Sequence, residues 1–236
     1  GQDVAINEYR LISRLNQRKV VFNIFGDTNQ LIKPGRGISD WSVVEDELSA
    51  SKFVLNENYR NTNQITKLCN TCFEMDVLQT GVDGASVREI SRSELEKELS
   101  VWNDRTERVA ILLPRGVKKK QYLHMEMLSE EIQNSIGEEI DAGKIAVMYV
   151  DEVKGIEFDR VFVVDNKMSR NEKYIAYTRA LSNLIVVVDD NVPDYDDGSD
   201  NSMGQEKKQK HSDIKESVYK WNSNGKLESL VEEGEI

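Results

Sequence analysis

The chain has 236 residues, of which 39% are hydrophobic, and this is enough to bury one core with a smaller appended piece. Its formal net charge of −11 argues against a simple nucleic-acid-binding module, because such modules usually present a basic face to phosphates. The lone pair Cys69 and Cys72 makes a zinc site unexpected and suits a cytoplasmic protein, and no apolar run approaches the ~20 residues of a membrane span.

The chain begins with a predicted helix and strand. Apolar residues recur at helical spacing from Val4 to Leu15, and residues 19–25 form an apolar run typical of a buried strand. Gly26 and Asp27 would follow at the carboxyl end of that strand, where ligands gather in open parallel sheets. Residues 1–50 supply no flanking strand, so this edge should pair with another chain, fold onto the rest of the protein or fray. A helix is predicted over residues 41–48.

A second unit begins near Lys52 and alternates strands with helices. β-Branched strands separated by helices are typical of a parallel sheet covered by helices, so the predicted fold class is α/β. The predicted strands are residues 52–55, 108–113, 145–150, 161–164 and 184–188, and the predicted helices are residues 62–73, 124–136 and 172–181.

The pattern changes after Asp189. Aspartates crowd residues 189–200, which contain no Lys or Arg, so this segment should repel phosphate. We expect residues 190–212 to be mobile. Beyond them the apolar residues are sparse, and two alternatives stay open for Tyr219 to Leu230: a hairpin around Asn224-Gly225 or a short docking element.

Four short segments contain the residues best suited to chemistry. They are Gly26-Asp27-Thr28-Asn29-Gln30, Asn58-Tyr59-Arg60, Lys154-Gly155-Ile156-Glu157-Phe158-Asp159 and Tyr177-Thr178-Arg179-Ala180. In order and spacing they resemble motifs III, IV, V and VI of the superfamily I helicases of the UvrD/Rep type. The resemblance rests on the ordered set and covers most of residues 1–188.

The resemblance implies a RecA-like sheet of the P-loop NTPase type and three parts. Residues 1–50 correspond to the end of the first RecA-like domain, residues 51–189 to the second RecA-like domain, and residues 190–236 to an acidic linker and C-terminal tail. The chain would be the C-terminal portion of an ATP-dependent DNA helicase that moves on single-stranded DNA.

The chain contains no Gly-x-x-x-x-Gly-Lys-Ser/Thr phosphate loop. If the resemblance holds, ATP and Mg²⁺ would be held mainly by an absent N-terminal helicase domain. We therefore expect the chain alone to hydrolyse no ATP.

Two arginines are the candidate catalytic residues. Guanidinium groups are permanently charged and forked, which suits them to the charge that builds on a γ-phosphoryl group. The resemblance implies that Arg179 reaches the γ-phosphate across the gap between domains and that Arg60 makes a second contact. Any single arginine could instead be a solvated surface residue.

The remaining nucleotide candidates also come from the resemblance. Gln30 would sense the γ-phosphate, supported by Asp27 from the same loop. Glu157 would accept hydrogen bonds from the ribose, next to Gly155, which permits close backbone approach, and Lys154. The remaining candidate is Gln2, because Gly1-Gln2-Asp3 resembles the end of the motif II box. A plain surface carboxylate is the alternative for Glu157.

The strand-contacting positions depart from the family pattern. Where the family has a base-stacking aromatic, the chain has residues 33–37, which include Arg36. Trp41 is the nearest aromatic that could stack on a base, and a buried residue anchoring its helix is the alternative. Before motif V, Tyr149 and Asp151 stand where the family favours Thr and His, and an aspartate would repel phosphate.

These departures keep a second function open. The rival is a helicase-like regulatory factor that uses nucleotide to grip a protein partner such as RNA polymerase. A plain α/β interaction domain is a third reading, which would make the motif order a coincidence. The Gly116-Val117-Lys118-Lys119-Lys120 segment lacks the second glycine and the Ser or Thr of a phosphate loop, so we interpret it as a basic turn before a helix.

Overall fold

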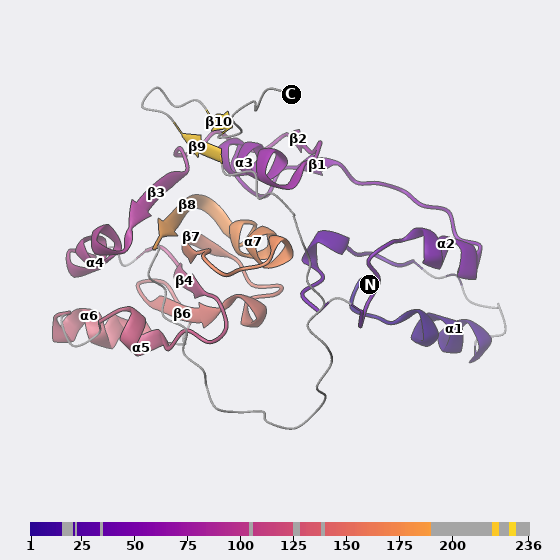
Figure 1. Ribbon diagram of the computed structural model, residues 1–236, viewed down its shortest axis with the longest axis horizontal. Helices are drawn as coiled ribbons and strands as arrows, with labels where there is room; N and C mark the ends of the chain where they lie inside the picture. The colour runs from indigo at the N-terminus through magenta and orange to yellow at the C-terminus, as the bar shows by residue number, and fades with distance from the viewer. Residues whose placement is uncertain are drawn as a thin grey trace, which may run out of the picture. The chain divides into compact units, whose positions relative to one another are not determined.

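The computed structural model describes residues 1–15, 21, 23–33, 35–103, 106–124, 128–137 and 140–189, and the backbone of 219–221 and 227–229 (Figure 1). The chain divides into two units, Gly1–Asp197 and Gly198–Ile236. The boundary expected near residue 50 falls inside the first unit and stays a prediction. The expected mobile segment, residues 190–212, lies outside the described residues.

A six-stranded sheet, parallel throughout, forms the centre of the first unit (Figure 1). Its inner strands contain continuous buried apolar runs, such as Val109–Leu113 and residues 161–164, as expected of a parallel sheet buried on both faces. The predicted α/β class, a parallel sheet with flanking helices, is therefore confirmed. In spatial order the strands are β3 (Arg88–Ser91), β8 (Ala180–Val188), β7 (Phe158–Val164), β4 (Val109–Leu113), β6 (Ile145–Tyr149) and β5 (Ile136–Gly137).

Helices cover both faces of this sheet because successive side chains of a strand point to opposite sides. In β7, Val161 and Val163 join a core with α3 (Asn63–Phe73) and α7 (Arg170–Tyr177). Phe162 and Val164 join the opposite core. That second core is covered by α4 (Arg92–Ser100), α5 (Lys119–Tyr122) and α6 (Glu130–Ser135).

The first 50 residues build a small cluster of their own. Helices α1 (Ile6–Leu15) and α2 (Ser42–Leu48) pack around Tyr9, Ile38 and Val44. The loop before α2 lies close against the chain start, since a Cβ on Gly37 would meet the Gln2 carbonyl oxygen at 2.1 Å. Between the helices, η1 (Thr28–Gln30) is a single 3₁₀ turn.

Smaller elements complete the described chain. Strand β1 (Glu57–Asn58) pairs in parallel with β2 (Leu78–Gln79), and η3 (Val150–Glu152) follows β6. In the second unit, β9 (Tyr219–Trp221) pairs antiparallel with β10 (Leu227–Ser229), which supports the hairpin alternative. No helix of the described residues is both long and apolar enough to cross a membrane.

Two predicted strands are wrong. The described residues of 19–25 are not in a strand, and Val21 and Phe25 are 84% and 75% exposed. Residues 52–55 are not a strand either. A strand needs a neighbour for its ladder hydrogen bonds, and no strand of the described residues pairs with either segment. Three consecutive apolar side chains there are 73% to 88% exposed: Phe53, Val54 and Leu55.

Two predicted helices are too long. Helix α6 begins only at Glu130, because Ser129 caps it by accepting a hydrogen bond from the Ile132 amide, and Ile136 already belongs to β5. Met127, predicted on that helix, lies outside the described residues. Helix α7 ends at Tyr177 rather than residue 181, because β8 begins at Ala180.

The sequence analysis also missed β3 and α4. Only one residue of β3, Ile90, is buried, so this edge strand shows no apolar run. Helix α4 does have a readable start, since Ser91 and Glu94 form a reciprocal capping box.

Candidate functional site

The candidate site lies where β7 and β8 begin. Glu157 directly precedes β7 and Arg179 directly precedes β8. The register pairs Phe158 with Ala180, so both side chains belong to the amino edge of the sheet. Phe158 itself is fully buried, as expected of a core residue.

Arg60 is brought to the same edge by the asparagine that follows it. Asn61 is 1% exposed, and its Nδ2 donates to the Ala180 carbonyl oxygen at 2.6 Å and to that of Thr178 at 3.3 Å. The Arg60 amide in turn donates to Asn58 Oδ1 at 3.0 Å. The chain between β1 and α3 is thereby fixed to the start of β8.

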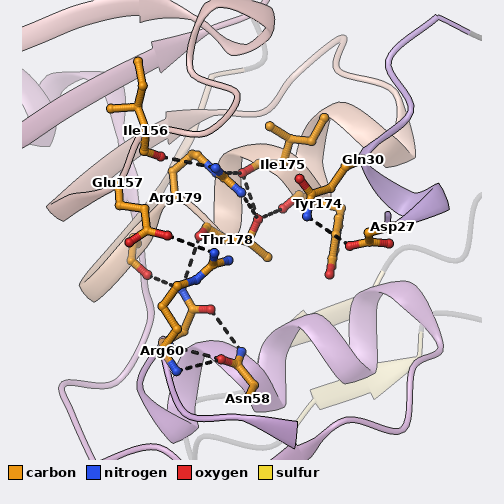
Figure 2. A network of polar contacts seen from close by, with 12 residues as sticks. Asp27, Gln30, Asn58, Arg60, Ile156, Glu157, Tyr174, Ile175, Thr178 and Arg179 are labelled. Atoms are coloured by element: carbon orange, nitrogen blue, oxygen red, sulfur yellow. Dashed lines mark hydrogen bonds and ion pairs between the residues drawn. The ribbon is translucent and has the colours of Figure 1, made fainter. Parts of the chain in front are cut away.

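Arg60 and Glu157 form an ion pair (Figure 2). Arg60 Nη1 lies 2.8 Å from Glu157 Oε1, and the two side chains are 42% and 34% exposed. An exposed pair of this kind contributes less than about 1 kcal/mol to stability, so it is not needed to hold the fold. The carboxylate that the resemblance assigns to a ribose is here in contact with the guanidinium assigned to a phosphate.

Arg179 is buried, being only 2% exposed. Its guanidinium donates to the carbonyl oxygens of Ile175 at 3.1 Å and Ile156 at 3.2 Å, and to Thr178 Oγ1 at 3.3 Å (Figure 2). Burial lowers the pKa of Arg179, the positive charge of Arg60 lowers it further, and the charge of Glu157 opposes the shift. Two guanidinium groups therefore lie close together beside one carboxylate, an arrangement that favours binding of an anion.

The η1 turn carries a second group of candidate residues. Asp27 caps the turn by accepting from the Asn29 amide at 3.0 Å, and Gln30 Nε2 donates to Asp27 Oδ2 at 3.1 Å (Figure 2). The pKa of Tyr174 in α7 is raised by burial and then by the charge and hydrogen bond of Asp27. The turn is thus joined to the helix that leads to Arg179.

The other nucleotide candidates lie around the same turn. Gln2 is buried, and its Oε1 accepts from the Asp27 amide at 3.2 Å. Lys154 pairs with the Asp3 carboxylate and donates to the Gln30 carbonyl oxygen at 3.0 Å. Gly155 has a φ of +86°, which glycine adopts without strain.

Three strand-contact candidates lie elsewhere. Arg36 is exposed in the loop before α2. Trp41 packs against the Tyr9, Ile38 and Val44 cluster beside α2, in agreement with the helix-anchoring alternative. Tyr149 ends β6 and therefore lies at the carboxyl edge of the sheet, opposite Glu157 and Arg179.

Two cationic side chains lie over the ring of Tyr149, and each of them pairs with a carboxylate. The Arg115 guanidinium carbon and Lys119 Nζ lie 4.5 Å and 4.7 Å from the centre of its ring. Asp151 accepts from Arg115 at 2.8 Å, and Glu152 pairs with Lys119 at 3.4 Å. The predicted basic turn does precede a helix, since α5 begins at Lys119.

Sequence reasoning missed several polar residues that organise the site: Asn58, Asn61, Arg170, Asn171 and Tyr174. Asn58 lies inside the segment that resembles motif IV, so its place in the site could have been predicted from the sequence. The other residues act through contacts with distant parts of the chain. In the described part of the chain, no cluster of three His, Cys, Asp or Glu side chains could hold a metal ion.

No protein-family model matches the chain, and no curated protein matches its sequence. Three similar solved structures share 15% to 19% identity with it, with TM-scores of 0.34 to 0.40. The C-terminal domain of a possible DNA helicase from Lactobacillus plantarum WCFS1 is 19% identical, covering 55% of this chain and 86% of its own length, with a TM-score of 0.37. The PRRSV helicase is 15% identical over 69% of this chain, with a TM-score of 0.40. Arterivirus nonstructural protein 10, a helicase, is 16% identical over 69% of this chain, with a TM-score of 0.34. The chain spans only 28% and 32% of the lengths of these two viral proteins.

Proposed function

We propose that the chain is the C-terminal motor portion of an ATP-dependent superfamily I DNA helicase of the UvrD/Rep type. The observation that carries the proposal is the convergence of Arg60, Glu157 and Arg179 at one edge of the sheet. Two cations beside one carboxylate suit a polyphosphate better than a metal ion. ATP would bind between this edge and the first RecA-like domain, whose phosphate loop and acidic pair would hold Mg²⁺.

The two arginines have different tasks in this proposal. Arg60 is half-exposed, so its guanidinium can turn from Glu157 to an incoming phosphate. Within the described part of the chain, Arg179 donates three hydrogen bonds of the five that a guanidinium can make, which leaves donors for the γ-phosphate. Glu157, released from Arg60, would accept hydrogen bonds from the ribose. Gln30 would contact the γ-phosphate and so couple the state of the nucleotide to the Asp27 turn.

The test is ATP hydrolysis by the chain joined to the half that carries the phosphate loop. Arg60→Ala and Arg179→Lys should each lower kcat by about 10³-fold, the usual contribution of an arginine at a transferring phosphoryl group. Arg88→Ala is the matched control, because Arg88 forms a similarly exposed ion pair with Glu98 at 2.8 Å. Unchanged kcat in both site variants would refute the proposal. So would magnesium-dependent ATP turnover by the chain alone that Arg179→Ala abolishes.

One observation favours the rival function, a nucleotide-driven factor that grips a protein such as RNA polymerase. At the strand-contact position Arg115 is neutralised by Asp151, and the whole chain is acidic. Single-stranded DNA should strongly stimulate the ATPase of a translocating motor. Absence of stimulation, together with an intact arginine dependence, would favour the protein-gripping factor.

A further inference from the structure

Side chains in the first turn of α7 are hydrogen-bonded to the η1 turn. Arg170 Nη1 donates to Asn29 Oδ1 at 3.1 Å. Asn171 Nδ2 donates to the Leu31 carbonyl oxygen at 2.8 Å and to that of Thr28 at 3.4 Å. None of the three residues of η1 is itself buried, so these directional bonds are well placed to fix where the turn lies.

Arg170 is itself held from a third element. It donates to the Phe73 carbonyl oxygen at the end of α3, and its guanidinium carbon lies 5.6 Å from the centre of the Phe73 ring. The start of α7 is fixed as well, because Ser169 and Glu172 form a reciprocal capping box around it. Arg170 and Asn171 therefore project from a backbone that has little freedom.

The same helix connects this contact to the candidate site. Tyr174, one turn further along α7, interacts with Asp27, and the chain reaches Arg179 just after the helix ends. A helix of 8 residues is about 12 Å long. Arg179 Nε donates to the carbonyl oxygen of Ile175 in the same helix at 3.1 Å, so α7 is bonded both to the η1 turn and to Arg179.

We infer that Arg170 and Asn171 are positioning residues that hold the Gln30 turn at a fixed place relative to Arg179. The inference rests on the proposed function, in which Gln30 and Arg179 contact the same γ-phosphate. Arg170 and Asn171 touch no nucleotide in this scheme. They set the distance between Gln30 and Arg179, which do contact the nucleotide.

Asn171→Asp is the sharpest variant. It replaces the donor with a carboxylate of the same shape facing two carbonyl oxygens, so both bonds are lost. An acidic residue in the first turn of a helix is favourable, so α7 itself should persist. Lys173→Ala is the matched control on the same helix, since Lys173 pairs with Asp165 at 3.3 Å. Arg170→Ala is the second variant.

Amide hydrogen exchange of the present chain is the first measurement. The amides of Asn29, Gln30 and Leu31 are all hydrogen-bonded within the turn. In Asn171→Asp their exchange should accelerate roughly tenfold, as expected when about one net hydrogen bond is lost, while exchange in β7 and β8 is unchanged. Equal exchange in Asn171→Asp and Lys173→Ala would overturn the inference.

ATP hydrolysis by the protein that includes the phosphate-loop half is the second measurement. Asn171→Asp and Arg170→Ala should lower kcat by between about tenfold and about 100-fold with KM for ATP little changed, because misplaced groups slow the chemical step. A purely structural role would lower the fraction of active enzyme and leave the pre-steady-state rate per active site intact. If Arg179→Lys abolishes turnover while Asn171→Asp does not change it, this inference fails and the proposed function stands. If neither Arg60→Ala nor Arg179→Lys changes kcat, the proposed function fails.

Discussion

At the scale of single residues, Arg60 and Arg179 show how two arginines of one site can differ in what they do for the fold. Arg60 is half-exposed and bonded to a carboxylate that is itself partly in solvent. Arg179 is buried and satisfies two backbone carbonyl oxygens, those of Ile175 and Ile156. Removing Arg179 would take away the hydrogen bond to the Ile156 carbonyl oxygen and one of the two side-chain donors of the Ile175 carbonyl oxygen, to which Thr178 Oγ1 also donates at 3.1 Å.

The difference gives a prediction for stability. Arg179→Ala should lower the free energy of unfolding by about 2–3 kcal/mol, because it empties a buried position and removes hydrogen bonds to two carbonyl oxygens. Arg60→Ala should lower it by less than about 1 kcal/mol. Urea unfolding followed by circular dichroism measures both. Equal losses for the two variants would contradict the burial of Arg179.

From the sequence, only residues within the motif-like segments could be predicted as members of the site. The resemblance grouped Arg60, Glu157 and Arg179, and the structure does bring them to one edge, while their roles stay predictions. It could not show that Glu157 pairs with Arg60, because that contact joins segments almost 100 residues apart in the chain. Nor could it find Asn171, whose bonds go to backbone oxygens that no sequence pattern marks.

At the scale of elements, α3 shows what the sequence does predict well. Its helical spacing predicts one apolar face made of Ile65, Leu68, Cys69 and Phe73. Ile65, Cys69 and Phe73 are buried, and Leu68 is half-buried against the same core. Strands are harder to predict from the sequence, because a strand forms only where another strand lies beside it to pair with. The 19–25 and 52–55 runs look like strands by composition, yet no strand in the described part of the chain pairs with them.

The two cysteines of α3 lie on different faces of the helix, one buried and one exposed. Cys69 is buried, and burial, followed by the neighbouring Cys72, raises its pKa to about 12. Cys72 is exposed, and its pKa is raised by local desolvation and then by the charge of Asp165. Because the thiolate is the reactive form, Cys72 should react with a disulfide reagent at a rate that increases with pH, and Cys69 should react only when the chain unfolds.

Ellman's reagent with and without urea separates the two thiols. The native chain should show one reacting thiol, and Cys72→Ser should show none until urea is added. Two thiols reacting at similar rates in the native chain would mean that α3 does not pack on the sheet as described.

At the scale of the whole molecule, the balance of charge sets how the protein meets nucleic acid. The chain has 31 basic and 42 acidic residues, so its overall field repels phosphate. Among the described residues, ion pairs with carboxylates are formed by Arg10, Arg60, Arg88, Arg92, Arg108, Arg115 and Arg160. The pair of Arg115 with Asp151 lies at the carboxyl edge of the sheet beside Tyr149. This combination of an aromatic ring and cations is suited to stacking and phosphate contact, and the carboxylates oppose it.

Asp151→Asn should therefore strengthen binding to single-stranded DNA. Neutralising this carboxylate still leaves Arg115 paired with a second acidic partner, Glu152, whose Oε1 lies 3.3 Å from Arg115 Nη2. More of the Arg115 charge is then available to a phosphate, so the slope of log affinity against log salt should steepen by at most about 0.7. The measurement is fluorescence anisotropy of a labelled oligothymidine between about 50 and 200 mM salt, the range over which phosphate contacts weaken steeply. Glu98→Gln is the control, because it removes the same charge and releases Arg88 at another site. If both variants bind equally well, total charge alone governs binding. If Asp151→Asn alone binds more tightly, then Asp151 specifically weakens phosphate contact at the proposed strand-contact position, and this outcome would support the proposed factor that grips a protein partner over a motor that tracks along DNA.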